Sequence, residues 1–177
     1  MILTRRVADG VWLTVYRSLA IVRLHGPERR QADRAAAERA WNLAAAAAGL
    51  SPQNAAGSRA HTEGSGAALV GPAGTKMGVD LVPLRRVTAR HAQAMLDVQE
   101  WDAMEGLGGI GAALAWGLKE AAAKAFGDPG RRFPAGLRIA GGTNGFTVAT
   151  RGESSSCVLG RWESIGSLLC VWVLGAP

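Results

Sequence analysis

Two acidic residues and two lysines in this chain have the types and the spacing that phosphate chemistry uses. Glu120 and Lys124 are four residues apart in the segment 116–126, so on a helix they share one face with Trp116. Lys119 would point about 100° away from Glu120. A carboxylate and an ammonium one turn apart can hold a metal ion and a phosphate. The same spacing is common in solvated pairs worth about 0.2–0.5 kcal/mol, and spacing does not separate these two interpretations.

Asp80 is the second acidic residue of interest. It lies within the apolar segment 78–82 and has apolar neighbours on both sides, which is unusual for a surface carboxylate. An aspartate in this setting is either a buried, hydrogen-bonded residue or a ligand for a hard cation such as Mg²⁺, which prefers oxygen donors. The segment itself favours neither interpretation.

The elements that must position these residues alternate in type along the chain. β-Branched and aromatic residues predict a strand at 11–16, which the apolar run 19–22 continues. Strong helix formers predict a helix over 28–48 that starts at Pro27, and residues 51–66 are typical of a loop.

Asp80 and Glu120 fall on a strand and on a helix, respectively. Strands at 67–70 and 77–82 flank a Gly-Pro-Ala-Gly turn and predict a hairpin. The order of elements predicts an α+β fold, with two halves at 1–75 and 76–177. The remaining elements are helices at 88–104 and 110–126, then strands at 137–140, 146–149, 156–159 and 167–174.

The composition restricts the class of protein. Hydrophobic residues make up 48% of the 177 residues and charged residues 19%, as in globular domains. No apolar run is long enough for a membrane span, the start lacks a secretory h-region, and Cys157 and Cys170 form no metal-binding pattern. We therefore expect a cytoplasmic protein without membrane contact. The net charge of +6 favours an anionic partner without identifying it.

The strand and the helix together resemble a known signature. A Gly-x-Asp at 78–80, followed by Trp-x-x-Lys-Glu-Ala-x-x-Lys at 116–124, is similar to the motifs of the phosphopantetheinyl transferases. The segment 59–62 resembles the Ser-His-Ser loop of the larger members, and 78–87 resembles the Gly-x-Asp-Ile…Arg-Ile pattern of the smaller, holo-acyl-carrier-protein-synthase type. The chain is thus intermediate between the two types.

The resemblance implies an activity and a fold. Family members transfer the 4′-phosphopantetheine arm of coenzyme A to a serine of an acyl or peptidyl carrier protein and release 3′,5′-ADP. The expected fold is a pseudo-dimer of two similar α+β halves with antiparallel sheets, with coenzyme A in the cleft between them. The resemblance allows a carrier protein of fatty-acid, polyketide or peptide synthesis. It also allows either a monomer or a trimer.

The resemblance also implies roles for individual residues. Asp80 and Glu120 would ligate Mg²⁺, and Glu120 and Lys124 would be the catalytic residues. Arg85 and Arg86 would dock the acidic helix of the carrier protein. The expected coenzyme A contacts are His61 at the nucleotide end, Arg29 and Arg34 at the 3′-phosphate, and Lys119 and Lys124.

Several positions depart from the family pattern. Val82 stands where the larger members carry a second acid, and Ala60 stands where the loop serine is expected. Glu100 is either a third acid near the metal or a glutamate on a helix surface, and the second interpretation is preferred.

Two other classes of protein remain as alternatives. The first is a catalytically silent relative that binds a carrier protein or acyl-CoA. The second, favoured only by the positive charge, is a nucleic-acid-binding domain, which should show a basic face with stacking aromatics. The Gly-x-Gly-x-x-Gly at 106–111 is not expected to bind a dinucleotide, because a helix rather than a strand should precede it.

Overall fold

The chain forms two compact units, Met1–Thr75 and Lys76–Pro177, in the computed structural model. This boundary coincides with the one expected from the sequence. The structure describes residues 1–18, 25–127, 135–142, 145–152 and 157–175. Each unit contains an antiparallel sheet with helical structure packed on it, so the α+β class predicted from the sequence is confirmed.

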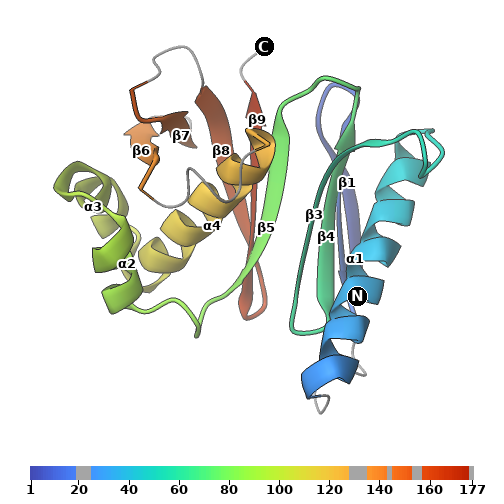
Figure 1. Ribbon diagram of the computed structural model, residues 1–177, viewed down its shortest axis with the longest axis horizontal. Coiled ribbons are helices and arrows are strands. Elements are labelled where there is room, and N and C mark those ends of the chain that lie inside the picture. The colour runs from blue at the N-terminus through green and yellow to red at the C-terminus, as the bar shows by residue number, and fades with distance from the viewer. Residues whose placement is uncertain (19–24, 128–134, 143–144, 153–156, 176–177) are drawn as a thin grey trace. The chain divides into compact units, whose positions relative to one another are not determined.

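The first unit is a four-stranded antiparallel sheet with one long helix. Its elements are β1 (Ile2–Ala8), β2 (Val11–Arg17), α1 (Gly26–Ala47), β3 (Ala56–Thr62) and β4 (Ser65–Gly71). The strand order is β1-β2-β4-β3, and α1 packs mainly on β4 and β2 (Figure 1).

Helix α1 follows directly from its composition. Pro27 occupies its first turn, where no backbone N–H is needed, and Gly49 follows its end with a φ of +70°. The side that meets the sheet is made of alanines, of which Ala40 and Ala44 are fully buried. Small side chains therefore let α1 lie close to the sheet.

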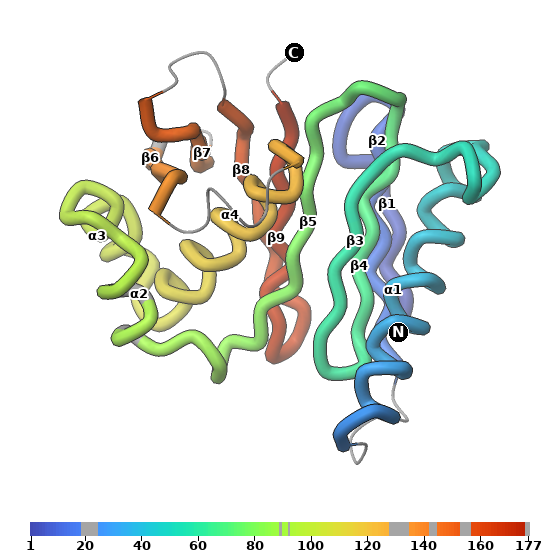
Figure 2. Tube along the Cα trace, viewed as in Figure 1, coloured from blue at the N-terminus to red at the C-terminus, as the bar shows by residue number. Residues whose placement is uncertain are grey.

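The second unit places one long helix on a five-stranded antiparallel sheet. The helices are α2 (Ala89–Met95), α3 (Val98–Glu105), the 3₁₀ helix η2 (Gly108–Ile110) and α4 (Gly111–Ala125). The strands are β5 (Met77–Pro83), β6 (Leu137–Gly142), β7 (Gly145–Thr150), β8 (Cys157–Ile165) and β9 (Leu168–Gly175). Their order is β5-β9-β8-β7-β6, and α4 packs mainly on β5 and β9 (Figure 2).

The two units share one topological plan. In the first unit a strand (β2) leads to a helix (α1) and then to a hairpin (β3–β4), whose second strand pairs antiparallel with β2. In the second unit β5 leads to α4 and later to the hairpin β8–β9, whose second strand pairs antiparallel with β5. Each unit adds elements to this plan: the first adds β1, and the second adds α2, α3, β6 and β7.

A glycine at the contact between helix and sheet permits close packing in each unit. A Cβ at Gly66 of β4 would lie 2.2 Å from the carbonyl of Ala36 on α1. A Cβ at Gly78 of β5 would lie 1.8 Å from the carbonyl oxygen of Ala121 on α4. Both distances are far below van der Waals contact, so only glycine fits at either position.

Most predicted elements are confirmed, but three predictions are wrong: the hairpin, the loop at 51–66 and the single helix at 88–104. The segments 67–70 and 77–82 are strands, yet they belong to different sheets and form no hairpin. The expected loop at 51–66 contains β3 and the start of β4, and β1 was not predicted. The run 19–22 lies outside the described residues.

The predicted helix at 88–104 is in fact two helices. The first helix, α2, ends at Met95, and Asp97 caps α3. The Asp97 side chain accepts a hydrogen bond from the backbone N–H of Glu100, and the Glu100 side chain accepts one from the N–H of Asp97. This reciprocal capping box stabilises a new helix start. No helix in the described part of the chain is long and apolar enough to cross a bilayer.

Candidate functional site

Asp80 and Lys124 meet between β5 and α4. Lys124 Nζ lies 2.8 Å from Asp80 Oδ1 and donates a second hydrogen bond, of 2.9 Å, to the carbonyl oxygen of Val79. The Asp80 side chain is 15% exposed and that of Lys124 is 26% exposed, so the pair is sheltered yet reachable from solvent. The fold thus joins two of the residues that were selected from separate segments of the sequence.

Glu120 lies one helical turn before Lys124 and is half-buried. Burial raises the pKa of its carboxyl group, the negative charge of Asp80 raises it further, and the positive charge of Lys124 opposes both effects. Glu120 and Lys124 are four residues apart and so share one face of α4, the face on which Lys124 meets Asp80. Asp80, Glu120 and Lys124 therefore form one cluster, which we call the acid–lysine cluster.

Gly78 explains why the cluster can form. Alternate residues of a strand share a face, so Gly78, Asp80 and Val82 of β5 all face α4. The missing side chain of Gly78 allows the close approach of β5 to α4 described above. At the next position Val82 is buried, and its Cγ2 would lie 3.0 Å from a Cβ at Gly117. The place where the larger phosphopantetheinyl transferases carry a second acid is thus filled by apolar packing.

The donor set of the cluster suits Mg²⁺ accompanied by a phosphate ligand. Asp80 and Glu120 offer carboxylate oxygens, the donors that a hard cation prefers. Among the described residues, no group of three or more His, Cys, Asp or Glu side chains is arranged to hold a metal. Protein sites for Mg²⁺ commonly supply one or two carboxylates and leave the other positions to water and phosphate, so a two-carboxylate set fits.

Lys119 does not belong to the cluster. Its side chain is fully buried, and its Nζ lies 2.9 Å from Glu100 Oε1 and donates a 2.8 Å hydrogen bond to the carbonyl oxygen of Met95. Burial lowers the pKa of the ammonium group, and the hydrogen bond and charge of Glu100 oppose that shift. The predicted coenzyme A contact of Lys119 is wrong in this structure, because the group faces the protein interior.

Glu100 is likewise not the helix-surface residue that was preferred from the sequence. Its side chain has 0% exposure, because α3 packs it inward against α4 and β6. Besides Lys119, it accepts hydrogen bonds from the N–H of Ile139 at 2.8 Å and from Arg151 at 3.1 Å. Its partners are those of a structural carboxylate rather than those of a third ligand in the cluster.

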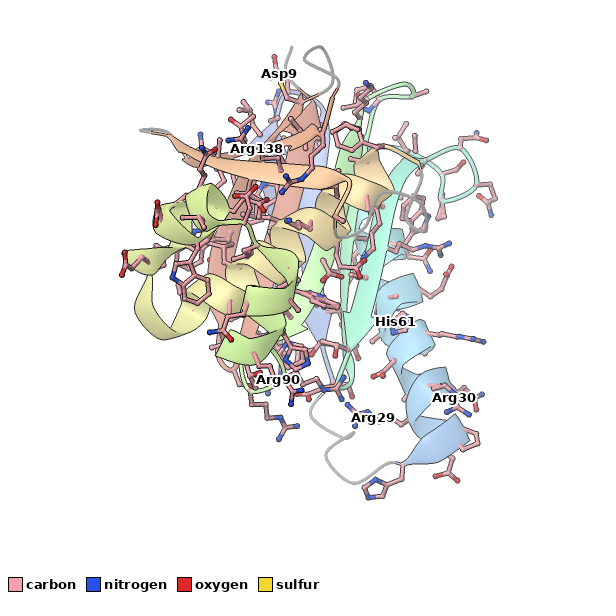
Figure 3. All side chains as sticks on the ribbon, turned by 60° about the vertical axis from the view of Figure 1, so that its left-hand side comes forward. Asp9, Arg29, Arg30, His61, Arg90 and Arg138 are labelled. Atoms are coloured by element: carbon pink, nitrogen blue, oxygen red, sulfur yellow. The ribbon has the colours of Figure 1, made fainter. Side chains whose placement is uncertain are left out.

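His61 and Arg34 lie in the first unit. Arg59, two residues before His61 on β3, donates a 2.8 Å hydrogen bond to Glu38 of α1. Just after β3, the backbone N–H of Gly64 donates a 2.6 Å hydrogen bond to Asp33 of α1. Because alternate strand residues share a face, His61 lies over the turn of α1 that carries Arg34. Both side chains are exposed, and Figure 3 shows His61 beside α1.

Arg29 differs from Arg34 in its surroundings. Its guanidinium lies 3.9 Å from Asp33 Oδ2 and 3.9 Å from Glu63 Oε1. Arg29 can bind a phosphate only in competition with these carboxylates, so Arg34 is the better placed of the two. Their assignment to the 3′-phosphate stays a prediction.

Arg85 and Arg86 follow β5 directly. Both are exposed, and the N–H of Arg86 bonds the carbonyl of Pro83 in a turn. Asp80 lies three residues before Pro83 on the same strand, a distance of about 10 Å. The predicted docking residues therefore lie near the acid–lysine cluster within the same unit.

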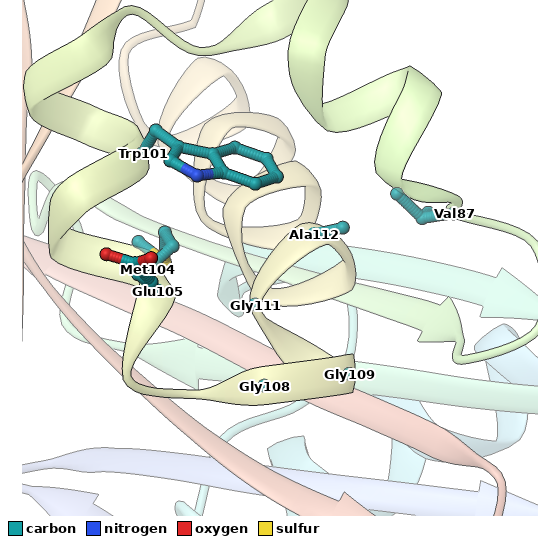
Figure 4. A pocket seen from close by; sticks show the side chains of 8 residues that line it. All are labelled: Val87, Trp101, Met104, Glu105, Gly108, Gly109, Gly111 and Ala112. Atoms are coloured by element: carbon teal, nitrogen blue, oxygen red, sulfur yellow. The ribbon is translucent and has the colours of Figure 1, made fainter.

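The glycine-rich segment 106–111 lines a cavity of about 250 Å³ (Figure 4). Helix α3 precedes it, as expected, which excludes a dinucleotide fingerprint. The indole of Trp101 borders the cavity, and other lining residues are Val87, Met104, Glu105, Gly108 and Ala112.

The buried network around Glu100 was missed from the sequence. One signal was present: Asp97 and Glu100 have the spacing of a capping box, which predicts a helix start at this point. That spacing predicts that α3 starts as a separate helix after Asp97. It also predicts that the Glu100 side chain bonds the backbone at the start of its own helix. The pairing with Lys119 depends on tertiary packing, which no local pattern predicts.

The fold and the cluster together define a two-unit α+β protein with a carboxylate–ammonium site between a strand and a helix. Comparison with protein-family models gives no match, and comparison with curated proteins gives none at a significant level. The functional assignment therefore rests on the residues and their geometry.

Proposed function

We propose that the protein is a 4′-phosphopantetheinyl transferase that moves the arm of coenzyme A to a carrier-protein serine. The observation that carries this proposal is the meeting of Asp80 and Lys124 at 2.8 Å, with Glu120 close enough for the Asp80 charge to raise its pKa. The Gly-x-Asp and Trp-x-x-Lys-Glu-Ala motifs resemble the family at these same positions.

The topology supports the fold that accompanies this function. Each unit contains a strand, a helix and a hairpin whose second strand pairs with the first strand. A repeated plan of this kind is what a pseudo-dimer of two α+β halves requires. It favours the larger, two-unit type of transferase and hence a monomer.

The residues of the cluster have distinct roles in the proposed reaction. The serine hydroxyl attacks the β-phosphorus of coenzyme A, the bond from that phosphorus to 3′,5′-ADP breaks, and 3′,5′-ADP leaves. Lys124 neutralises negative charge on the diphosphate, as preorganised electrostatic stabilisation. Glu120 accepts the serine proton directly or through water.

Asp80 and Glu120 would hold Mg²⁺, which supplies charge neutralisation on the diphosphate when it is bound. The resemblance assigns His61 and Arg34 to the nucleotide end of coenzyme A. Arg85 and Arg86 would attract an acidic helix of the carrier protein, in a contact that weakens with salt.

Intact mass spectrometry tests this function directly. The protein, Mg²⁺, coenzyme A and an apo carrier protein should give a carrier that gains the mass of one phosphopantetheine arm. Asp80→Asn and Glu120→Gln should abolish the gain, whereas Asp9→Asn, at an exposed aspartate of the first unit, should not. A folded protein that modifies none of several apo carriers would refute the proposal.

A catalytically silent relative is the second candidate. It is favoured by the apolar packing of Val82, which stands where the larger transferases carry a second acid. Such a protein would bind coenzyme A or a carrier protein, measurable by calorimetry, without any gain in carrier mass.

A further inference from the structure

Helix α4 is held on two of its sides by lysines that belong to different interactions. On one side Lys119 reaches Glu100 of α3 and the carbonyl of Met95 at the end of α2. On another side Lys124 reaches Asp80 and the carbonyl of Val79 on β5. The first contact is fully buried, whereas the second is partly open to solvent.

The Glu100 carboxylate is a rigid anchor for Lys119. Its Oε1 accepts a hydrogen bond from the backbone N–H of Ile139 on β6, and its Oε2 accepts one from the N–H of Asp97 at 3.0 Å. Arg151 bonds Glu100 and, at 2.7 Å, Asp97. The carboxylate that receives Lys119 is thus fixed to a strand of the sheet and to the first turn of α3.

A small rotation of α4 would disrupt the acid–lysine cluster. Lys119 and Glu120 are adjacent, so a rotation that moves Lys119 away from Glu100 moves Glu120 through the same angle. A helix with its side chains is about 10–12 Å wide, so a rotation of about 20° shifts a carboxylate at its surface by ~2 Å. A shift of this size is large beside the 2.8 Å contact between Lys124 and Asp80.

We propose that the Lys119–Glu100 pair is a positioning device that fixes the rotation of α4 and so holds Glu120 and Lys124 against Asp80. The inference rests on the proposed function, because it concerns the same cluster. Neither residue touches a substrate. Both act through α4. They are the two most deeply buried charged side chains in the described part of the chain.

The test uses Mn²⁺ in place of Mg²⁺ and compares two variants with a control. Lys119→Met removes the ammonium group. This single variant leaves the charge of Glu100 buried with one partner fewer. The double variant Lys119→Met/Glu100→Gln removes both charges and should therefore regain stability. Val148→Ala, in the same apolar core but outside the ion pair, is the control for lost stability.

Electron paramagnetic resonance gives the Mn²⁺ dissociation constant, and two-dimensional ¹H–¹⁵N NMR reports the amides of Val79 and Asp80. We expect the constant to rise at least about tenfold in both Lys119 variants, as when groups that orient metal ligands are removed. The two amide signals should move as well. In Val148→Ala, both the constant and the signals should stay near those of the wild type.

The double variant distinguishes positioning from simple stabilisation. If its Mn²⁺ affinity returns to the wild-type value together with its stability, or if Val148→Ala weakens Mn²⁺ as much as Lys119→Met does, the proposal is overturned. A wild-type protein that binds no Mn²⁺ would count against the proposed function instead. The NMR comparison would then decide the positioning role, and unmoved Val79 and Asp80 amides in both Lys119 variants would refute it.

Discussion

Replacing Gly78 with alanine should separate β5 from α4 and thereby Asp80 from Lys124. The new Cβ would lie 1.8 Å from the carbonyl oxygen of Ala121, whereas ordinary contact begins at 3.4 Å, so the two backbones must part by about 1.6 Å. A retreat of that size would stretch the 2.8 Å contact of Lys124 with Asp80 beyond hydrogen-bond distance. The substitution thus links packing directly to the site.

The size of the effect follows from the nature of the clash. Overpacking costs about 1–3 kcal/mol, and a clash with a backbone carbonyl, which cannot rotate away, belongs at the upper end. For 177 residues the unfolding entropy is about 0.37 kcal/mol/K, so ~3 kcal/mol lowers the melting temperature by roughly 8 °C. Calorimetry measures this loss. Mn²⁺ affinity should fall at least about tenfold in the same variant, because Asp80 on β5 also moves away from Glu120 on α4, the other proposed ligand.

Gly66→Ala is the matched control for Gly78→Ala. Its Cβ would lie 2.2 Å from the carbonyl of Ala36 in the first unit, so a similar loss of stability is expected. Mn²⁺ affinity should not change, because the acid–lysine cluster belongs to the second unit. The reasoning fails if Gly78→Ala melts and binds Mn²⁺ like the wild type, or if both alanine variants weaken Mn²⁺ binding equally.

Three further predictions concern charged groups. Lys119→Met should lower the free energy of unfolding by about 3–5 kcal/mol in urea titrations, because it breaks a fully buried pair. Arg59→Met, in the exposed pair with Glu38, should lower it by less than about 1 kcal/mol. Equal losses in the two variants would contradict the view that Lys119 is buried and Arg59 exposed. Because the pKa of Glu120 is raised on folding, the folded protein binds its proton more tightly than the unfolded chain. Stability relative to Glu120→Gln should therefore fall as the pH rises above the ordinary glutamate pKa of 4.5, and parallel pH profiles in denaturant titrations would refute this. Lys124→Gln removes a positive charge beside the carboxylates, so Mn²⁺ should bind about 3- to 10-fold more tightly while transfer to the carrier is lost; weaker Mn²⁺ binding would contradict the electrostatic role.

The local sequence predicts the elements of this protein better than their partners. The helix that begins at Pro27 and the strand that carries Asp80 depend on composition and on turn residues, which act over a few positions. Whether β4 pairs with β5 or with β2 is decided by contacts between segments that are far apart in the sequence. The Gly-Pro-Ala-Gly sequence after β4 is compatible with a hairpin turn, yet here it connects two sheets.

The candidate site divides in the same way. Asp80, Glu120 and Lys124 were selected because motif spacing and helical periodicity place them on defined faces, and the fold brings them together. Lys119 was misassigned, because the same periodicity cannot say what faces the other side of the helix. Its partner Glu100 comes from α3, nineteen residues earlier, and only the packing of α3 against α4 and β6 joins them.

The direction of the pKa shift separates the capping Asp97 from the proposed functional Glu120. Asp97 has a lowered pKa, because it accepts a hydrogen bond from the backbone N–H of Glu100 and lies beside Arg151. Its own surroundings therefore stabilise its charge. Glu120 has a raised pKa, because burial and Asp80 disfavour its charge more than Lys124 favours it. A group in that state gains stability when a cation arrives, so the half-buried Glu120, rather than the fully buried Glu100 or the capping Asp97, is the carboxylate on α3 and α4 that is suited to hold a metal.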